Sequence, residues 1–209
     1  MSNKIVQIGK ATLINGDCIE YMSTLKDKKF DLAVVDPPYG INVNQMNMGS
    51  RKTVKPTKKG WDSHIPDQEY FDKLFSIASN QIIFGGNYFP LPNSRYFAIW
   101  DKGETMYGRD FAECEYAWVR SGGTRIFKLN PNQLDRFHPT QKPVKLYEWI
   151  FTNYAKPGQR ILDTHGGSMS SVIAALNLGF EIVCIEKDEE YFNAAADRVI
   201  KSQQQQRMF

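Results

Sequence analysis

Few cysteines and no long apolar run characterise this chain. Its three cysteines, Cys18, Cys114 and Cys184, are odd in number and far apart, which argues against a disulfide framework and against a metal cluster. No stretch approaches the roughly 18 apolar residues that a membrane span requires. The first residues lead into an alternating strand without a signal-peptide core. We therefore expect a cytoplasmic protein that has no membrane partner.

An excess of charge of one sign is also absent. The 26 Lys and Arg residues against 23 Asp and Glu residues leave a net charge of +3, which is too small to indicate nucleic-acid binding by itself. With 209 residues, 42% of them hydrophobic, the chain is long enough to bury a substantial core. We expect a single domain over residues 1–209.

Strand-like apolar runs alternate with helix-like stretches, which predicts an α/β fold with a largely parallel sheet. The expected strands are Ala11–Asn15, Leu32–Val35, Gln81–Phe84, Tyr96–Trp100, Glu115–Val119, Ile161–Leu162 and Ile182–Ile185. The expected helices are Cys18–Leu25, Asp67–Asn80, Pro143–Tyr154 and about Ser168–Leu178.

Two segments are basic and lack a clear period, so we expect variable loops at about residues 45–60 and 120–137. The first contains no acidic residue, and its cations are Arg51, Lys52, Lys55, Lys58 and Lys59. These five charges are candidates for binding phosphate groups. An ordinary solvated loop is an equal alternative for any one of them.

A glycine turn, Asp163 to Ser168, falls between a predicted strand and a predicted helix. Such a turn lets the backbone approach a ligand and exposes the amides of the helix N-terminus. Glu186 ends the next strand, 23 residues after Asp163, close to the spacing of roughly 20 at which an acid binds the ribose of a nucleoside cofactor. Because the full G-x-G-x-x-G pattern is missing, a purely structural turn is an equal alternative.

Two further segments belong to loops expected at the same edge of the sheet. Gly16-Asp17 follows one strand, and the hexapeptide from His138 to Pro143 precedes a helix. Loops at the carboxyl ends of neighbouring parallel strands converge on one crevice, so these segments could share a ligand. Asp17 could instead cap the helix that begins near Cys18, and His138 with Lys142 could form an ordinary surface turn.

The tetrapeptide Asp36-Pro37-Pro38-Tyr39 carries the strongest signal. A given string of four residues occurs by chance in on the order of one in a thousand chains of this length. Two prolines after a buried strand end its pairing and direct Asp36 and the Pro37 carbonyl outward. A structural strand terminator needs only one proline, so the string predicts a catalytic role.

Together with Gly40, this string resembles the catalytic motif of the DNA amino-methyltransferases that act on adenine N6 or cytosine N4. In the subgroup with permuted order, typical of small phage and restriction–modification enzymes, the catalytic motif comes first. A His-Pro-Thr-Gln-Lys-Pro-like element follows, and the cofactor glycine loop comes last, as here. The resemblance implies a Rossmann-like, S-adenosylmethionine-dependent methyltransferase fold with a mostly parallel sheet flanked by helices.

By the same resemblance, the catalytic residues are Asp36, Pro37, Pro38 and Tyr39. It implies cofactor contacts from Asp17, Cys18, Asp36, Thr140, Lys142, Asp163, Thr164, Gly166, Gly167, Ser168, Met169 and Glu186. The glycine loop departs from the family pattern: Thr164 and His165 replace Pro and Phe, and Met169 and Ser170 replace Gly and Thr. With Met169 in the first helical turn, we expect altered cofactor contacts rather than none.

The resemblance implies site-specific methylation of adenine N6 in DNA by base flipping, without a metal. Asp rather than Ser at position 36 favours adenine over cytosine N4, which is the alternative. Two further alternatives stay open, namely an RNA methyltransferase and a catalytically silent binding module of the same fold. Enzymes that methylate a glutamine amide normally carry Asn in place of Asp36, so the carboxylate argues against them. Dimers are common in the family, and a homodimer is therefore an expectation.

Overall fold

The computed structural model describes residues 4–27, 29–42, 62–109, 112–131, 137–138 and 140–206. These residues form one nine-stranded sheet in the order β1-β2-β9-β8-β3-β4-β6-β5-β7. Its strands are β1 Lys4–Ile8, β2 Ala11–Asn15, β3 Phe30–Val35, β4 Ala78–Phe84, β5 Tyr96–Asp101, β6 Cys114–Val119, β7 Arg125–Lys128, β8 Arg160–Asp163 and β9 Glu181–Glu186. The five central strands from β2 to β4 are parallel, while β1 and β6 pair antiparallel at either side of them. The expected α/β fold with a mostly parallel sheet is confirmed.

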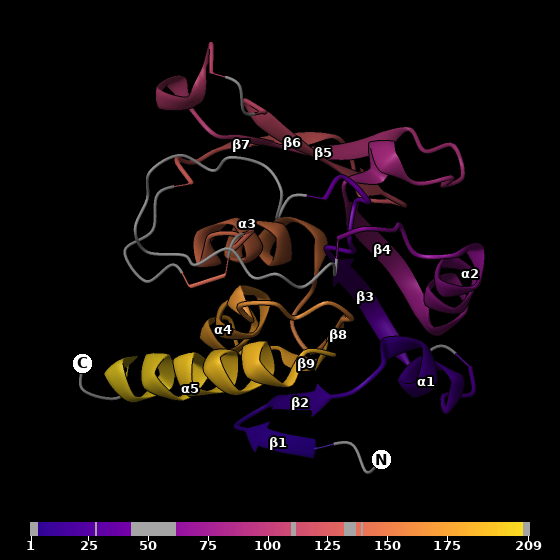
Figure 1. Cartoon of the computed structure of the whole chain (residues 1–209), viewed down its shortest axis with the longest axis vertical. Helices are drawn as coiled ribbons and strands as arrows, with labels where there is room; N and C mark the ends of the chain where they lie inside the picture. The colour runs from indigo at the N-terminus through magenta and orange to yellow at the C-terminus, as the bar shows by residue number, and fades with distance from the viewer. Residues whose placement is uncertain are drawn as a thin grey trace.

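Helices cover both faces of this sheet (Figure 1). On one face lie α1 Cys18–Ser23 and α2 Gln68–Ile77, and on the other lie α3 Val144–Tyr154, α4 Ser170–Asn177 and α5 Glu189–Gln206. Two short 3-10 helices, η2 Gly86–Tyr88 and η3 Glu104–Met106, follow β4 and β5. None of the helices within the described ranges is both long and apolar enough to cross a bilayer.

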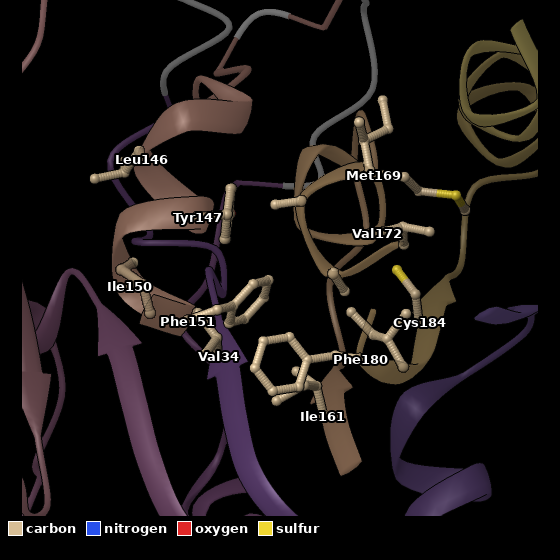
Figure 2. Packing of buried hydrophobic residues seen from close by; sticks show 14 of the residues in the cluster. Val34, Leu146, Tyr147, Ile150, Phe151, Ile161, Met169, Val172, Phe180 and Cys184 are labelled. Carbon is tan, nitrogen blue, oxygen red and sulfur yellow. The ribbon is translucent and has the colours of Figure 1, made fainter. Parts of the chain in front are cut away.

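The larger core lies between the sheet and helices α3 to α5. Tyr147 and Phe151 of α3 belong to one cluster with Val34 of β3 and Ile161 of β8. Figure 2 shows the Phe151 ring beside the Phe180 ring, with centroids 5.9 Å apart. Full burial of one such side chain contributes about 1.5–3 kcal/mol. Because α3 directly follows Gln141, Lys142 and Pro143, this packing helps to hold these three buried residues in place.

Several boundaries differ from the sequence predictions. The expected helix Asp67–Asn80 ends at Ile77, since Ala78 already pairs with Phe30 of β3 in the sheet. The second basic region is not a continuous loop, because Arg125–Lys128 forms β7 and pairs with β5. Helix α4 begins at Ser170 rather than near Ser168.

Candidate functional site

The four predicted acidic positions follow or end neighbouring parallel strands. Asp17 follows β2, Asp36 follows β3, Asp163 ends β8 and Glu186 ends β9. In the sheet these strands are adjacent, in the order β2-β9-β8-β3. Their carboxyl ends therefore bring the four carboxylates to one edge of the sheet, where ligands bind in open α/β folds.

Both oxygens of the Asp36 carboxylate accept hydrogen bonds. The Tyr39 hydroxyl donates to Oδ1 over 2.6 Å, and the Lys142 ammonium donates to Oδ2. Burial raises the pKa of Asp36 above its ordinary value, and the positive charge of Lys142 opposes that shift without cancelling it. The structure thus joins the tetrapeptide to the hexapeptide through Asp36 and Lys142.

The chain around Tyr39 is held by residues that the sequence did not single out. The backbone amides of Tyr39 and Gly40 donate to Asp62 Oδ1 over 2.7 and 3.1 Å. Gly85, at φ +68°, lies so close to the Tyr39 ring that a side chain there would collide with it. The other neighbour is Tyr88, whose ring stacks on Tyr39 with centroids 5.0 Å apart and planes 11° apart.

Glu115 is a second site residue that sequence reasoning missed, since it was only the expected start of a strand. Its carboxylate lies 3.1 Å from the Lys142 ammonium and 3.0 Å from that of Lys102. Burial alone would lower the pKa of Lys142, but Asp36 and Glu115 together raise it above its ordinary value. The result is a row of alternating charges, Asp36, Lys142, Glu115 and Lys102.

The glycine turn packs directly on the end of β9. The Gly166 amide donates to the Ile185 carbonyl over 2.8 Å, and a Cβ on Gly166 would lie 2.7 Å from Cys184 Sγ. The Gly167 amide donates to Glu186 Oε2 over 2.7 Å, and the Asp188 amide donates to Oε1 over 2.8 Å. Burial raises the pKa of Glu186. Glycine is required at position 166 by this close approach, and the approach places Glu186 beside the turn.

Asp163 lies beneath the turn rather than at its surface, with an exposed fraction of 2%. Its carboxylate accepts hydrogen bonds from the Ser171 hydroxyl and from the His165 amide. Burial raises the pKa of Asp163 to about 7, and it lowers that of His165 to about 4. The Thr164 hydroxyl lies 2.6 Å from the Tyr70 hydroxyl of α2. These contacts brace the turn from both sides of the sheet.

Met169 does not lie in the first helical turn, contrary to expectation. It precedes α4 in a left-handed conformation, with φ 54° and ψ 34°. A non-glycine residue in this conformation is strained by roughly 1–2 kcal/mol, which explains why the family pattern has glycine there. Full burial of the Met169 side chain in the larger core offsets this strain.

The hexapeptide also contacts the glycine turn. The His138 ring lies 3.6 Å from where a Cβ on Gly167 would stand, and it contacts the Tyr191 ring with centroids 4.5 Å apart. The Thr140 hydroxyl lies 3.3 Å from His138 Nδ1. The hexapeptide is therefore not an ordinary surface turn, because His138 reaches the glycine turn and Lys142 reaches Asp36.

Asp17 caps α1, as the alternative proposed. Its Oδ1 accepts from the Ile19 and Glu20 amides over 2.8 and 3.3 Å, and its Oδ2 pairs with Lys187. These donors lower the pKa of Asp17 against the opposing effect of burial. Burial raises the pKa of the neighbouring Cys18 thiol to about 12. The cofactor contacts expected of Asp17 and Cys18 stay a prediction.

The predicted DNA-binding charges lie outside the described residues: Arg51, Lys52, Lys55, Lys58 and Lys59. Within the described ranges, no group of three or more His, Cys, Asp and Glu residues is arranged to hold a metal ion.

Comparison with known proteins points to one family. A family model described as DNA methylase, for N6 and N4 methyltransferases, matches residues 94–197, about half of the chain. The curated "Putative methylase YubD" of Escherichia coli (strain K12) is 24% identical over 208 residues, covering 89% of this chain and 88% of the relative. The "Type II methyltransferase M2.DpnII" of Streptococcus pneumoniae is 22% identical over 240 residues, covering 91% and 90%.

A solved structure shares the fold over nearly the whole chain. The M1.HpyAVI–SAM complex superposes with a TM-score of 0.60 at 22% identity, covering 90% of this chain and 99% of that one. This likeness confirms the predicted fold class.

Proposed function

Because this chain belongs to the N6/N4 family of DNA methylases, we propose that it methylates the exocyclic N6 amine of adenine at a specific site in DNA. S-adenosylmethionine is the cofactor, as the sequence predicted, and it supplies a methyl group already activated on a sulfonium. The observation that carries the proposal is the Asp36 carboxylate, held by Tyr39 and Lys142 at the edge of the sheet that also carries the glycine turn.

The residues of the glycine turn fit a nucleoside cofactor. Gly166 and Gly167 have no side chains, so the backbone of the turn can lie close to the end of β9 and to the His138 ring. Each oxygen of Glu186 accepts one backbone amide, which leaves lone pairs for the ribose hydroxyls. We assign the remaining contacts to Asp17, Cys18, Thr140, Lys142, Thr164, Ser168 and Met169, and we assign Asp163 to bracing the turn from beneath.

Asp36 and the Pro37 carbonyl orient the target amine. The lone pair of an adenine amine is delocalised into the ring, so the amine is a poor nucleophile. Two hydrogen bonds, donated to Asp36 and to the Pro37 carbonyl, favour a pyramidal nitrogen whose lone pair faces the methyl group. Orientation of this kind supplies much of the rate of an in-line transfer. Asp36 can then relay the amine proton to water.

Tyr39 provides a face for the extrahelical base. Flipping a base out of the duplex costs a few kcal/mol, which stacking on an aromatic ring offsets in part. The contacts of the Tyr39 backbone with Asp62 and of its ring with Tyr88 hold this face in place before DNA arrives.

The proposal of adenine rather than cytosine as the target base rests on the residue at position 36. Aspartate there resembles the adenine-N6 members, whereas serine is more frequent among cytosine-N4 members. The alternative, methylation of cytosine N4, uses the same carboxylate and the same cofactor. A single domain, a homodimer and a role in restriction–modification stay predictions.

Mapping modified bases in DNA from cells that express the protein tests the proposal directly. We expect N6-methyladenine at one recurring sequence, and an Asp36→Ala variant serves as the control that should leave the DNA unmodified. N4-methylcytosine at the site would establish the alternative. Radiolabelled transfer to duplex DNA, single-stranded DNA and RNA ranks the substrates. Absence of S-adenosylmethionine binding in calorimetry would instead support a silent binding module.

A further inference from the structure

Lys142 occupies an oxygen of Asp36 that the target amine also needs. Asp36 Oδ2 accepts from the Lys142 ammonium, while Oδ1 accepts from the Tyr39 hydroxyl. Each oxygen of Asp36 therefore already has one donor, and an exocyclic amine that approaches along either of these directions replaces Tyr39 or Lys142. The Lys142 side chain is 4% exposed, and a buried ammonium without a counter-ion is strongly disfavoured. Lys142 therefore needs another anion before it can leave Asp36.

Glu115 offers that anion at the right distance. Its Oε2 lies 3.1 Å from the Lys142 ammonium, yet this buried oxygen accepts no aligned hydrogen bond from any described residue. The Lys142 ammonium donates instead to Asp36 and, over 3.4 Å, to the Tyr39 hydroxyl. A small rotation of the ammonium would give Glu115 the bond that its buried oxygen lacks, and would do so without exposing the lysine to water.

The Glu115 carboxylate is itself anchored. Its backbone lies in β6, paired with Trp100 of β5, and its other oxygen lies 3.0 Å from the Lys102 ammonium. Lys102 in turn lies over the Trp100 ring, 5.4 Å from the centroid. Because strand and lysine both hold Glu115, it stays in place whether or not Lys142 turns toward it.

We propose that Glu115 is a positioning residue of the methyl-transfer reaction: it receives the Lys142 ammonium when the target amine binds Asp36. The proposal rests on the proposed function only in requiring a base amine at Asp36. It therefore holds equally for adenine N6 and for cytosine N4. Until the base arrives, Lys142 opposes protonation of the Asp36 carboxylate and holds it in place.

Glu115→Gln, which keeps the shape of the side chain and removes its charge, tests this role. Binding is measured to the duplex carrying the mapped site and to the same duplex with the target amine deleted, purine replacing adenine. The unmodified enzyme should prefer the amine-bearing duplex, and Glu115→Gln should lose most of that preference, with kcat reduced about 100-fold. Glu113→Gln is the matched control, because it neutralises an exposed acid two residues away that accepts from the Gly108 amide.

Equal preference for the amine in Glu115→Gln and in the unmodified enzyme would overturn the proposal. A second measurement avoids any dependence on folding of the variant: the structure of the unmodified enzyme with the site duplex and a non-reactive cofactor analogue. The Lys142 ammonium should then donate to Glu115, and an ammonium still bonded to Asp36 beside a bound amine would refute the role. If the unmodified enzyme transfers no methyl group to any DNA, the proposed function itself has failed, which radiolabelled transfer shows independently.

Discussion

The Lys142 ammonium donates a hydrogen bond to the Asp36 carboxylate, although the two residues lie 106 positions apart in the chain. Their contact therefore depends on the tertiary structure, which brings two distant segments together. Asp36 is placed by the end of β3, and Lys142 by the segment that enters α3. Their contact makes the catalytic carboxylate and the hexapeptide parts of one site.

Replacing Asp36 should abolish methyl transfer and leave the fold intact. Asp36→Ala removes the acceptor of the target amine, and Asp36→Asn, of the same shape, should lower kcat by about 100- to 10,000-fold. Radiolabelled transfer with purified protein measures the loss, and circular dichroism checks the fold. Turnover retained by a folded Asp36→Ala variant would refute the assignment of Asp36 as the acceptor of the target amine.

Two substitutions at Tyr39 separate its ring from its hydroxyl. Tyr39→Ala removes the stacking face, worth about 1–3 kcal/mol per base, and should raise the KM for DNA roughly 5- to 150-fold. Tyr39→Phe keeps the ring and frees one Asp36 oxygen, so its KM should stay near that of the unmodified enzyme. Steady-state kinetics on the site duplex gives both values. Equal effects of the two changes would argue against stacking.

Removing the Lys142 charge should destabilise the protein. Lys142→Met leaves Asp36 and Glu115 as buried carboxylates without their shared cation, which costs about 3–5 kcal/mol. Urea unfolding followed by circular dichroism measures the free energy of unfolding. Lys145→Met, at an exposed position three residues later, should change it by less than about 0.5 kcal/mol. A loss of the same size in both variants would show that the ion pair contributes no stability.

Asp163 should make stability depend on pH in an unusual direction. Its pKa is about 7 in the folded protein, against about 3.9 when unfolded. Between these values the folded state binds more protons, so this residue lowers the free energy of unfolding as the pH rises. Asp163→Asn removes this contribution. Between pH 4 and pH 8, the free energy of unfolding of this variant should therefore rise by a few kcal/mol relative to that of the unmodified protein.

Urea unfolding across this pH range tests the sign. Ser171→Ala is the informative comparison, because loss of the Ser171 hydroxyl should raise the pKa of Asp163 further and extend the fall in stability to higher pH. A difference between Asp163→Asn and the unmodified protein that is constant with pH would contradict the raised pKa.

Removing the five cations of the first basic segment should weaken DNA binding and make the binding constant depend less on the salt concentration. If Arg51, Lys52, Lys55, Lys58 and Lys59 each neutralise one phosphate, changing all five to Gln lowers the slope of log K against log salt by about 4.5. Titrations at several salt concentrations measure that slope. An unchanged slope would identify this segment as a solvated loop.

Local patterns predicted much of the architecture and the ends of its key strands. The apolar run Leu32–Val35 followed by two prolines predicted a buried strand that ends at Asp36, and β3 ends at Val35. The glycine turn and the spacing to Glu186 predicted their proximity, which the Gly167 amide confirms. These features are readable because strand ends, turns and caps depend on residues a few positions apart.

Only the tertiary structure brought Glu115, Asp62 and Tyr88 to the site. Each is an ordinary residue of a strand, loop or short helix, and nothing in its neighbours signals a role. The sheet places β6 next to β4 although β5 intervenes in the sequence, and this order carries Glu115 to Lys142. A buried charge pair forms where folding brings opposite charges together away from water, and no local pattern of the sequence predicts which residues will meet.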